Sequence, residues 1–478
     1  MNLTRRELLG YGCAFTALGA ESKPNIVVIL CDDLGSGDVS AYYPASKTPT
    51  PRMDRLAREG VRFLDAHSPS GVCTPTRYGL LTGRYCWRTK LKQGVLNGLS
   101  PALIEPGRDT IASVLKREGY RTGVFGKWHL GLGTDEKADY SKELHPSPND
   151  YGFDEFFGIP ASLDMPPYLY IRNRRAVELP TKTIGDNGVP PRGAFWRGGP
   201  IAPGFEMEQV LTRFTDNAVQ FIKDSAQAKQ PFFAYVPLSG PHTPWVPSKK
   251  FQGVSREGGL YADFVAEVDH CVGRIADQLA ASKVAENTLI IVTSDNGAPW
   301  SEPDIAATKG HRANMDWRGQ KSDIQEGGHR IPLIARWPGR IRPNTTSNAL
   351  LCLTDLFATC AAAAGAKLSR ESGEDSYNQL AALEGRADLP IRPDIVHHSG
   401  NGLFSIRQGS WKLILGRGSG GFTKPAKVEP KAGEPAGELY DLRADPHEDR
   451  NLYAERPQVV AALTQLLEKY RAQGFSRP

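Results

Sequence analysis

Several continuous apolar runs of strand length occur along the chain, and two of them end in polar side chains. Residues 25–33 read NIVVILCDD, residues 288–296 read TLIIVTSDN and residues 232–238 read FFAYVPL. An apolar run without polar alternation is typical of a strand buried on both faces, as in a parallel sheet covered by helices. We therefore expect these runs to form buried strands of a mainly parallel sheet.

Segments with helical periodicity lie between the apolar runs. In residues 261–282 one helical face collects Phe264, Val268, Val272, Ile275 and Leu279. The other elements that the pattern predicts are strands at residues 120–125 and 332–337, a helix running into a strand at residues 51–63, and helices at residues 110–119, 208–223, 348–365 and 457–473. This mixture predicts an α/β fold whose large sheet is sandwiched by helices.

Composition changes near residues 367–390, where the chain becomes polar and charged. Beyond this point residues 403–415 predict a hairpin-like pair of strands around Gln408 and Gly409. We therefore divide the chain into a leader at residues 1–22, a large domain at residues 23–388 and a smaller domain at residues 389–478.

Residues 150–203 are dense in Pro, Gly and aromatic residues and show no sustained periodicity. Long segments of this kind inside compact domains are often functional. We interpret this one as a loop region that shapes a substrate site, with candidate wall residues Tyr168, Arg172, Arg174 and Trp196. A tolerated surface excursion is the alternative.

The N-terminus resembles a twin-arginine export signal. Arg5 and Arg6 precede a short, weakly apolar run that ends in small residues near Ala20. This pattern predicts export to the periplasm or the extracellular space. A disordered amphipathic N-terminus is the alternative. The run is too short to span a bilayer, and no other segment is a transmembrane candidate, so we expect no stable membrane insertion.

The overall charge is mildly basic. The formal net charge is +5 and the sequence pI is about 8.7, without long runs of Lys or Arg. This balance argues against nucleic acid as the main partner, although it suits an enzyme that attracts anionic substrates. From the number and spacing of the seven cysteines we expect few or no disulfides. No pattern in the sequence indicates an oligomeric state.

Oxygen-bearing side chains follow two of the predicted strands. Asp32 and Asp33 end the first, and Asp295 and Asn296 end the one near residue 290. If both strands lie centrally in one sheet, these four side chains converge at the edge where open α/β sheets bind ligands. Carboxylate and amide oxygens suit a hard cation such as Ca²⁺ or Mg²⁺. The alternative for each pair alone is a turn that caps the next helix.

The stretch CTPTRYGLLTG begins at Cys73 and places Arg77 one helical turn later. A cation beside a nucleophile at a helix N-terminus favours bound anions. The alternative is a free thiol in a turn before a helix, with Arg77 as an ordinary surface charge.

Two further stretches carry acid-base groups. In an extended chain Lys127 and His129 share one face, because side chains alternate with a period of two. His242 stands between Pro241 and Pro244 just after a predicted strand, so that it is rigidly presented. The alternatives are a surface Lys beside a half-buried His for the first pair, and a capped, partly buried imidazole for His242.

Taken in chain order, these motifs are similar to those of the type I, formylglycine-dependent sulfatases. The order is a paired Asp, C-x-P-x-R, G-Y-x-T followed by G-K-x-H, P-H-x-P, S-D-N-G, and Lys321 five residues before E-G-G. The resemblance covers nearly the whole chain after the leader. One departure is Thr76, where the family more often carries Ser or Ala; it bears on how efficiently Cys73 is converted.

The resemblance implies an alkaline phosphatase-like fold with a smaller α+β C-terminal domain, built of an antiparallel sheet and a packed helix. It also implies that a formylglycine-generating enzyme oxidises Cys73 to Cα-formylglycine, whose hydrated form attacks the sulfur of a sulfate ester. The bound ion would be Ca²⁺, with Mg²⁺ as the second choice. Its implied ligands are Asp32, Asp33, Asp295, Asn296 and the modified Cys73.

The same resemblance implies a role for each remaining motif residue. Lys127 and Lys321 bind the sulfate oxygens, and Arg77 orients the nucleophile. His242 protonates the leaving alcohol, and His129 takes a proton so that sulfate is expelled and the aldehyde returns.

The segment GHRANMDWRGQK around Lys321 resembles sulfatases of the arylsulfatase and N-acetylgalactosamine-6-sulfatase kind. From it we take His311, Arg312, Trp317 and Arg318 as candidate substrate contacts, with a solvated loop as the alternative. The expected substrate is a sulfated small molecule or glycan, and a sulfated carbohydrate is favoured.

Two other functions stay open from sequence. A phosphonate monoester or phosphodiester hydrolase of the same superfamily would share the fold and the formylglycine motif. An inactive protein that binds sulfated glycans through calcium would share the cation site and the basic cleft.

Overall fold

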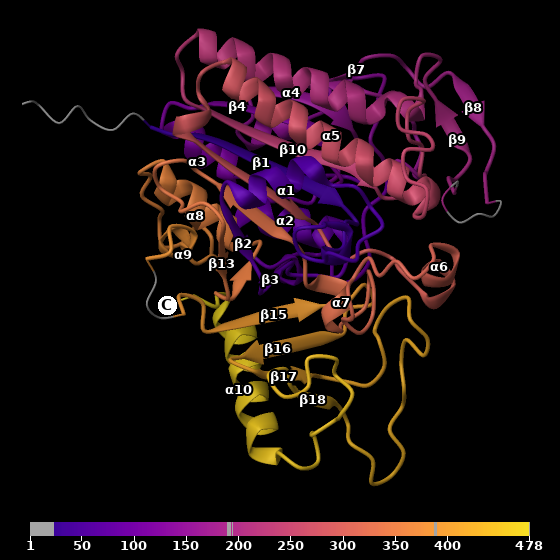
Figure 1. Cartoon of the computed structure of the whole chain (residues 1–478), viewed down its shortest axis with the longest axis vertical. Helices are drawn as coiled ribbons and strands as arrows, with labels where there is room; N and C mark the ends of the chain where they lie inside the picture. The colour runs from indigo at the N-terminus through magenta and orange to yellow at the C-terminus, as the bar shows by residue number, and fades with distance from the viewer. Residues whose placement is uncertain (1–22, 189–192, 194, 387–389, 478) are drawn as a thin grey trace, which may run out of the picture.

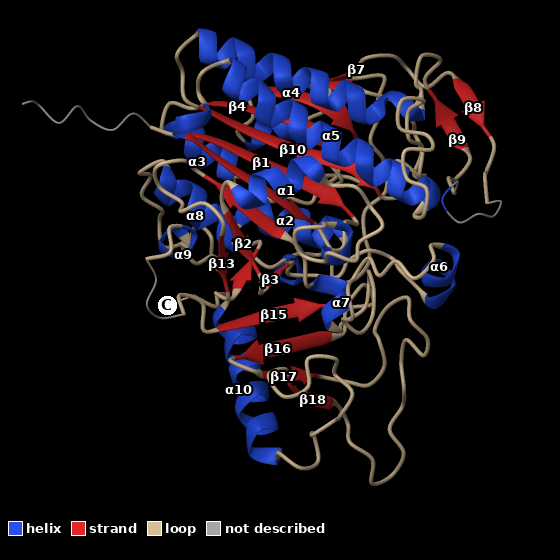
Figure 2. Ribbon diagram, in the orientation of Figure 1, coloured by secondary structure: helices blue, strands red, loops and turns tan. Residues whose placement is uncertain are grey.

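The computed structural model describes residues 23–188, 193, 195–386 and 390–477 of the chain. The predicted export signal at residues 1–22 lies outside the described residues and stays a prediction. Figures 1 and 2 show a large body of helices around a twisted sheet, with a smaller sheet and a terminal helix below it. None of the described helices is both long enough and apolar enough to cross a membrane.

The large body is built on a ten-stranded sheet in the order β13-β2-β12-β11-β1-β10-β4-β5-β6-β7. Its five central strands are parallel, and they are β11 (Thr288–Ser294), β1 (Asn25–Asp32), β10 (Phe232–Pro241), β4 (Arg121–Lys127) and β5 (Glu155–Ile159). The flanking strands are β12 (Leu333–Arg336), β2 (Val61–Phe63), β13 (Thr345–Ser347), β6 (Ile171–Arg172) and β7 (Arg175–Ala176). The predicted large, mainly parallel sheet is therefore confirmed.

Helices cover both faces of this sheet. On one face α1 (Pro51–Arg58), α4 (Val210–Gln227) and α5 (Gly259–Ala281) pack together, and α4 and α5 run side by side across the strands (Figure 1). A second layer consists of α2 (Cys73–Thr82), α3 (Ile111–Arg117) and α8 (Asp355–Ala363). All eight residues of β1 are buried, as its continuous apolar pattern predicts.

The smaller body is a four-stranded antiparallel sheet at the C-terminal end of the chain. It contains β15 (Asp394–His398), β16 (Phe404–Gln408), β17 (Trp411–Ile414) and β18 (Glu438–Asp441). Helix α10 (Pro457–Gln473) packs on it through Leu463, Leu467 and Tyr470. The predicted hairpin is the pair β16–β17, and the final helix has the predicted bounds.

The remaining elements are the short strand pairs β3 (Ala66–His67) with β14 (Leu351–Cys352) and β8 (Lys182–Ile184) with β9 (Gly199–Ile201), and helices α6 (Glu302–Ala307), α7 (Glu326–His329) and α9 (Leu380–Leu383).

Two local predictions are wrong. Residues 150–203 were predicted to be a loop region, but they contain β5 of the main sheet and the short strands β6 to β9. A five-residue strand reading EFFGI, which contains Gly158 and is followed by Pro160, is too short to show a period. Residues 348–365 are not one helix, because the pairing of β14 with β3 takes up their first part and α8 begins only at Asp355.

The six cysteines within the described residues are all buried and unpaired.

Buried charges and histidines join the two bodies. Lys412 on β17 lies 3.0 Å from Glu326 and 2.8 Å from Glu448, with all three side chains fully buried. Beside them His329 and His397 stack with ring centroids 3.8 Å apart. Burial, and then neighbouring positive charge, holds the pKa of both imidazoles well below its usual value, so these rings are neutral in the folded protein at neutral pH.

This junction predicts loss of stability in acid. Burial lowers the pKa of His398 on β15 to about 4, whereas an unfolded histidine titrates near 6.5. Between these values the unfolded chain binds more protons, so the free energy of unfolding falls as the pH decreases from about 6.5 to about 4. For His398 alone the loss is about 3 kcal/mol.

Denaturant unfolding at stepwise pH should therefore show a flatter pH dependence for His398→Gln than for the native protein. His145→Gln is the control, because the His145 side chain is 54% exposed. Parallel curves for His398→Gln and the native protein would contradict the assignment.

Candidate active site

Strand register places the polar strand ends at one edge of the main sheet. Asp32 pairs with Pro241 of β10, and Cys31 pairs with Ser294 of β11. The residues that follow these strands are His242 and Asp295, so they reach the same edge. A hydrogen bond of 3.1 Å from the Asp33 backbone N–H to Asp295 Oδ1 links the two strand ends directly.

The adjacent strand β4 brings Lys127 to this edge. A Cβ atom at Gly126 would lie only 1.9 Å from the carbonyl oxygen of Pro237 on β10. Because only glycine lets the two backbones come so close, the end of β4 reaches the tip of β1. Lys127 Nζ lies 2.9 and 2.7 Å from the two carboxylate oxygens of Asp32.

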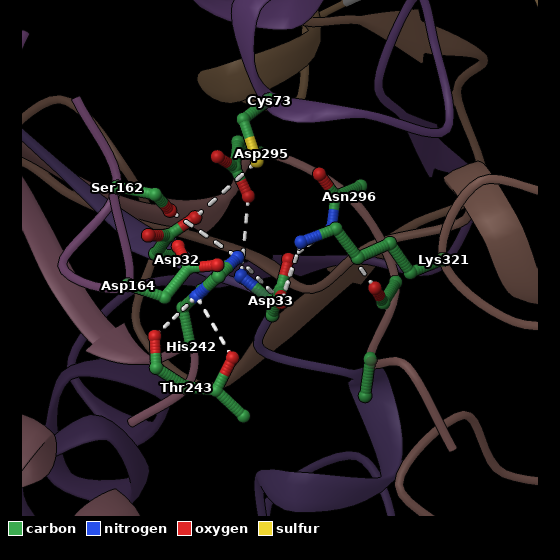
Figure 3. Close-up of polar contacts among 12 residues, drawn as sticks. Asp32, Asp33, Cys73, Ser162, Asp164, His242, Thr243, Asp295, Asn296 and Lys321 are labelled. Carbon is green, nitrogen blue, oxygen red and sulfur yellow. Dashed lines mark hydrogen bonds and ion pairs between the residues drawn. The ribbon is translucent and has the colours of Figure 1, made fainter. Parts of the chain in front are cut away.

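Helix α2 points its N-terminus at the same group. Cys73 is the first residue of this helix, and its Sγ lies 3.6 Å from Asp32 Oδ1 (Figure 3). The side chain is almost completely buried. Burial raises the pKa of the Cys73 thiol well above its usual value, although Lys127 and Lys321 oppose the shift. The unmodified cysteine is therefore a neutral thiol.

Arg77 fixes the helix to the strand ends from one turn further along. Its guanidinium donates two hydrogen bonds to Asp295 Oδ2, of 3.1 and 2.7 Å, and one of 3.0 Å to the Lys127 carbonyl. It also lies 3.3 Å from Asp32 Oδ1. The side chain is fully buried, so it is no surface charge.

The buried charges of the site balance one another. The carboxylates of Asp32, Asp33 and Asp295 face Arg77, Lys127 and Lys321, the last of which lies 2.8 Å from Asp33 Oδ2. Burial alone would raise the pKa of Asp32, but Lys127, His242 and Arg77 together outweigh it and hold this pKa well below its usual range. Burial, and then the charge of Asp32, raises the pKa of Asp295 to about 6.

The donor atoms at the sheet edge fit a hard divalent cation. Asp32, Asp33, Cys73 and His242 each offer a ligand atom, and these atoms all lie within 4.8 Å of one another. Asn296 donates 2.6 Å to Asp33 Oδ1, while its own Oδ1 is buried and has no hydrogen-bond partner among the described residues. A buried, unpartnered oxygen beside two carboxylates is the donor type that Ca²⁺ and Mg²⁺ prefer. Asp295 lies beside Asp33, because its Oδ1 accepts a hydrogen bond of 3.1 Å from the Asp33 backbone N–H while its Oδ2 pairs with Arg77.

The two histidines differ in what holds them. His129 has a left-handed backbone with φ 58°, not the extended conformation that the sequence predicts. Its Nε2 donates 2.7 Å to the Leu96 carbonyl, and its Nδ1 is buried without a partner among the described residues. Burial, and then the charges of Lys127 and Arg77, holds the pKa of His129 well below its usual value. The ring is therefore a neutral base with a free nitrogen.

His242 is held through its other nitrogen. Nδ1 donates 2.6 Å to the Thr243 carbonyl, so Nε2 is the nitrogen that faces the site. It lies 3.2 Å from Ser162 Oγ and 3.7 Å from Asp33 Oδ2.

Ser162 is a site residue that sequence reasoning missed. Figure 3 shows Ser162 beside His242, and its hydroxyl lies 3.2 Å from His242 Nε2. The same hydroxyl lies 2.9 Å from Lys127 Nζ, so it bridges the two residues. A single serine in a segment rich in Pro and Gly gives no sequence signal. Only the position of the loop after β5, beside β4, could have indicated it.

A cavity of about 460 Å³ opens onto this cluster. Its walls come from distant parts of the chain. They are the strand ends, the start of α2, the segment after β5, the later part of the loop region 150–203 around Phe195, and the C-terminal body. They include Asp33, Cys73, His129, Ser162, Asp164, Phe195, Arg197, His242, Lys321, Asn401 and Phe422.

The residues chosen by sequence as substrate contacts lie elsewhere. His311 is fully buried, pairs with Asp38 at 2.8 Å and does not line the 460 Å³ cavity. Arg312, Trp317 and Arg318 line a separate cavity of about 610 Å³ that shares Phe422 with the first. The loop region 150–203 also contained four predicted wall residues. None of them lines the 460 Å³ cavity; they are Tyr168, Arg172, Arg174 and Trp196. They were chosen by residue type, and packing decides which side of a loop each one faces.

Comparison with known proteins agrees with this geometry. The sulfatase family model matches residues 24–366. An N-acetylgalactosamine-6-O-sulfatase of Bacteroides thetaiotaomicron is 34% identical, over 94% of this chain and 93% of that protein. Human arylsulfatase G is 33% identical, over 80% of this chain and 72% of that protein.

Among solved structures, a 6S-sulfatase from a study of glycosaminoglycan metabolism by Bacteroides thetaiotaomicron superimposes with a TM-score of 0.83 at 33% identity. The alignment covers 94% of this chain and 99% of that one. A sulfatase from a Pseudoalteromonas species gives a TM-score of 0.74 at 25% identity, over 94% of this chain and 90% of that one. The chain therefore belongs to the sulfatase family of sulfuric ester hydrolases, with an alkaline phosphatase-like fold.

Proposed function

We propose that this enzyme hydrolyses sulfate monoesters of a sulfated carbohydrate, with a formylglycine derived from Cys73 as nucleophile and a bound calcium ion. The observation that carries the proposal is the position of Cys73. It begins a helix whose N-terminus faces three carboxylates and three buried cations, at the base of the 460 Å³ cavity.

The unmodified thiol is a poor nucleophile. A cysteine acts as a nucleophile through its thiolate, and burial raises the pKa of this thiol. Oxidation by a formylglycine-generating enzyme would replace the thiol by an aldehyde, which hydrates to a pair of hydroxyl groups. One hydroxyl oxygen then attacks the sulfur, and the bond from sulfur to the leaving oxygen breaks.

The cation would be held by Asp32, Asp33, Asp295, Asn296 and the modified Cys73. When bound, a divalent cation lowers the pKa of a hydroxyl beside it and neutralises developing negative charge. Ca²⁺ fits better than Mg²⁺, because a set of protein oxygens suits its higher coordination number, whereas Mg²⁺ keeps several waters.

Lys127 and Lys321 bind the sulfate oxygens, and Arg77 orients the nucleophile and adds positive charge. The ammonium groups of Lys127 and Lys321 and the guanidinium of Arg77 are fixed by hydrogen bonds to Asp32, Asp33 and Asp295 before any substrate arrives. Fixed positive groups in a site sheltered from water stabilise the charge that develops on the sulfate oxygens in the transition state.

The two histidines handle the protons. His242 gives a proton from Nε2 to the leaving oxygen, while the Thr243 carbonyl keeps Nδ1 protonated. His129, a neutral base with a free Nδ1, takes the proton of the second hydroxyl. Loss of that proton expels sulfate and restores the aldehyde. Steps of this kind contribute about 10²- to 10⁴-fold each.

The carbohydrate substrate rests on the relatives. One relative is named an N-acetylgalactosamine-6-O-sulfatase, and another, from the dog, is named an N-acetylgalactosamine-6-sulfatase. A cavity with both aromatic and polar walls is compatible with a sugar ring.

The nucleophile is tested by mass spectrometry of the tryptic peptide that contains Cys73, together with turnover of sulfate, phosphate and phosphonate esters of one chromogenic alcohol. We expect the mass of an aldehyde in place of the thiol and a preference for the sulfate ester. Cys73→Ala should lower kcat by at least about 10³-fold, because it removes the covalent nucleophile.

Cys86→Ala is the matched control, since Cys86 is another buried free cysteine outside the cavity. Full activity of Cys73→Ala would contradict a mechanism in which the nucleophile derives from Cys73. Preference for a phosphodiester would assign the other hydrolase activity, and binding without turnover by converted protein would assign an inactive glycan-binding protein.

The cation is tested by thermal unfolding after treatment with a chelator. Calcium at a hundredfold excess over its Kd should raise the free energy of unfolding by about 2.7 kcal/mol, and more than Mg²⁺ at equal concentration. Asn296→Leu should reduce this shift, because it removes the unpartnered oxygen. Asn217→Leu on helix α4 is the control and should keep the shift. An equal shift in Asn296→Leu would remove Asn296 from the ligand set.

A further inference from the structure

We propose that Asp164 and Arg197 form a sugar-binding element, in which the free oxygen of the Asp164 carboxylate accepts a hydrogen bond from a hydroxyl group of the sulfated sugar. This inference rests on the proposed function, and it identifies the hydroxyl group of the sugar that the enzyme recognises. Neither residue belongs to the motifs that identify the family.

The Asp164 carboxylate is buried and only half satisfied. The residue is 4% exposed, and Arg197 forms an ion pair with Oδ2. The other oxygen, Oδ1, has no hydrogen-bond partner among the described residues. A buried acceptor without a donor costs about 1–3 kcal/mol. Because Asp164 lines the cavity, a ligand in that cavity can supply the missing donor.

The position of Asp164 points to the leaving group of the reaction. Two residues earlier, Ser162 contacts both Lys127 and His242. Figure 3 shows Asp164 on the same side of the cluster as Ser162 and His242, away from Lys321. His242 is the proposed acid for the departing oxygen, so Asp164 lies next to the sugar that carries this oxygen. A carboxylate would also repel the sulfate group itself.

Arg197 and an aromatic ring hold the carboxylate in place. The Arg197 backbone N–H donates 3.0 Å to the Asp164 carbonyl, and its guanidinium lies over the Phe195 ring, 5.1 Å from the centroid. Phe195 is 37% exposed and Phe422, from the C-terminal body, is 52% exposed, and both line the cavity. Two exposed aromatic side chains beside a fixed acceptor suit a sugar ring, which has apolar faces and hydroxyl groups at its edge.

This arrangement narrows the substrate class. An ionised carboxylate accepts hydrogen bonds and does not donate them. The sugar must therefore present a hydrogen-bond donor at this point, which at an unmodified ring position is a hydroxyl group, and a second sulfate or a uronic acid carboxylate there would be repelled. We infer a substrate with a free hydroxyl beside the scissile sulfate ester.

The test compares Asp164→Asn with the native enzyme on two kinds of substrate. One is the best-hydrolysed member of a panel of monosulfated hexoses and N-acetylhexosamines, and the other is 4-nitrophenyl sulfate, which has no sugar hydroxyl. We expect kcat/KM for the sugar to fall about 10- to 100-fold more than kcat/KM for the aryl sulfate, the loss typical of a hydrogen bond to a charged group.

A second measurement identifies the hydroxyl. Deoxy analogues of the sugar, each lacking one hydroxyl, should include one that the native enzyme hydrolyses more slowly by a similar factor. For that analogue, Asp164→Asn should cost little further, because the two changes remove the same contact. Asp150→Asn is the matched control, since Asp150 also pairs with an arginine, Arg174, but does not line the 460 Å³ cavity. It should leave the ratio of the two activities unchanged.

The outcomes separate the two levels of the proposal. Equal losses on both substrates, or additive losses for every deoxy analogue, would overturn the role of Asp164 while the sulfatase reaction stands. Native enzyme with confirmed formylglycine that hydrolyses the aryl sulfate but no sugar would overturn the sugar-binding element and the carbohydrate substrate together. Failure to hydrolyse either would overturn the proposed function itself.

Discussion

The site depends on neutralising three carboxylates that the sheet buries at one edge. Asp32, Asp33 and Asp295 are each at most 1% exposed, and buried charges are tolerated only when they are paired and hydrogen-bonded. Arg77, Lys127 and Lys321 supply the pairing, each from a different part of the chain. The cluster is already balanced by its own charges, so the folded protein presents these groups in position before the proposed cation or an anionic ester binds.

Strand geometry does most of this positioning. The register of β1 against β10 and β11 fixes which residues reach the edge, and the close approach at Gly126 brings β4 to the same level. Helix α2 then starts at the edge with Cys73, and Arg77 ties it to Asp295. Two residues at the edge, Asp33 and His129, have a positive φ. Uncommon backbone conformations of this kind persist at functional sites when the surrounding structure holds them.

The walls of the cavity have a different origin from its base. The base uses the ends of central strands and the first turn of one helix, which the core holds rigidly. The walls come from the segment after β5, from the later part of the loop region 150–203 around Phe195 and from the C-terminal loops that carry Asn401 and Phe422. Loops tolerate change far better than strand ends do. The chemistry at sulfur is therefore carried by the sheet, and the choice of substrate by the loops around it.

The sequence alone determined the buried central strands, the type of sheet and the residues that converge at its edge. These features could be predicted because an apolar run that ends in polar residues is a pattern of neighbouring residues in the chain. It also indicated Cys73 and Arg77 through their helical spacing. It did not reveal β5, the left-handed backbone at His129 or the bridging role of Ser162. The tertiary structure decided these, and it buried His311 against Asp38 while it brought Asp164 to the wall of the cavity. Which side chain faces a cavity depends on contacts between segments far apart in the chain, and residue type and local periodicity carry no information about such contacts.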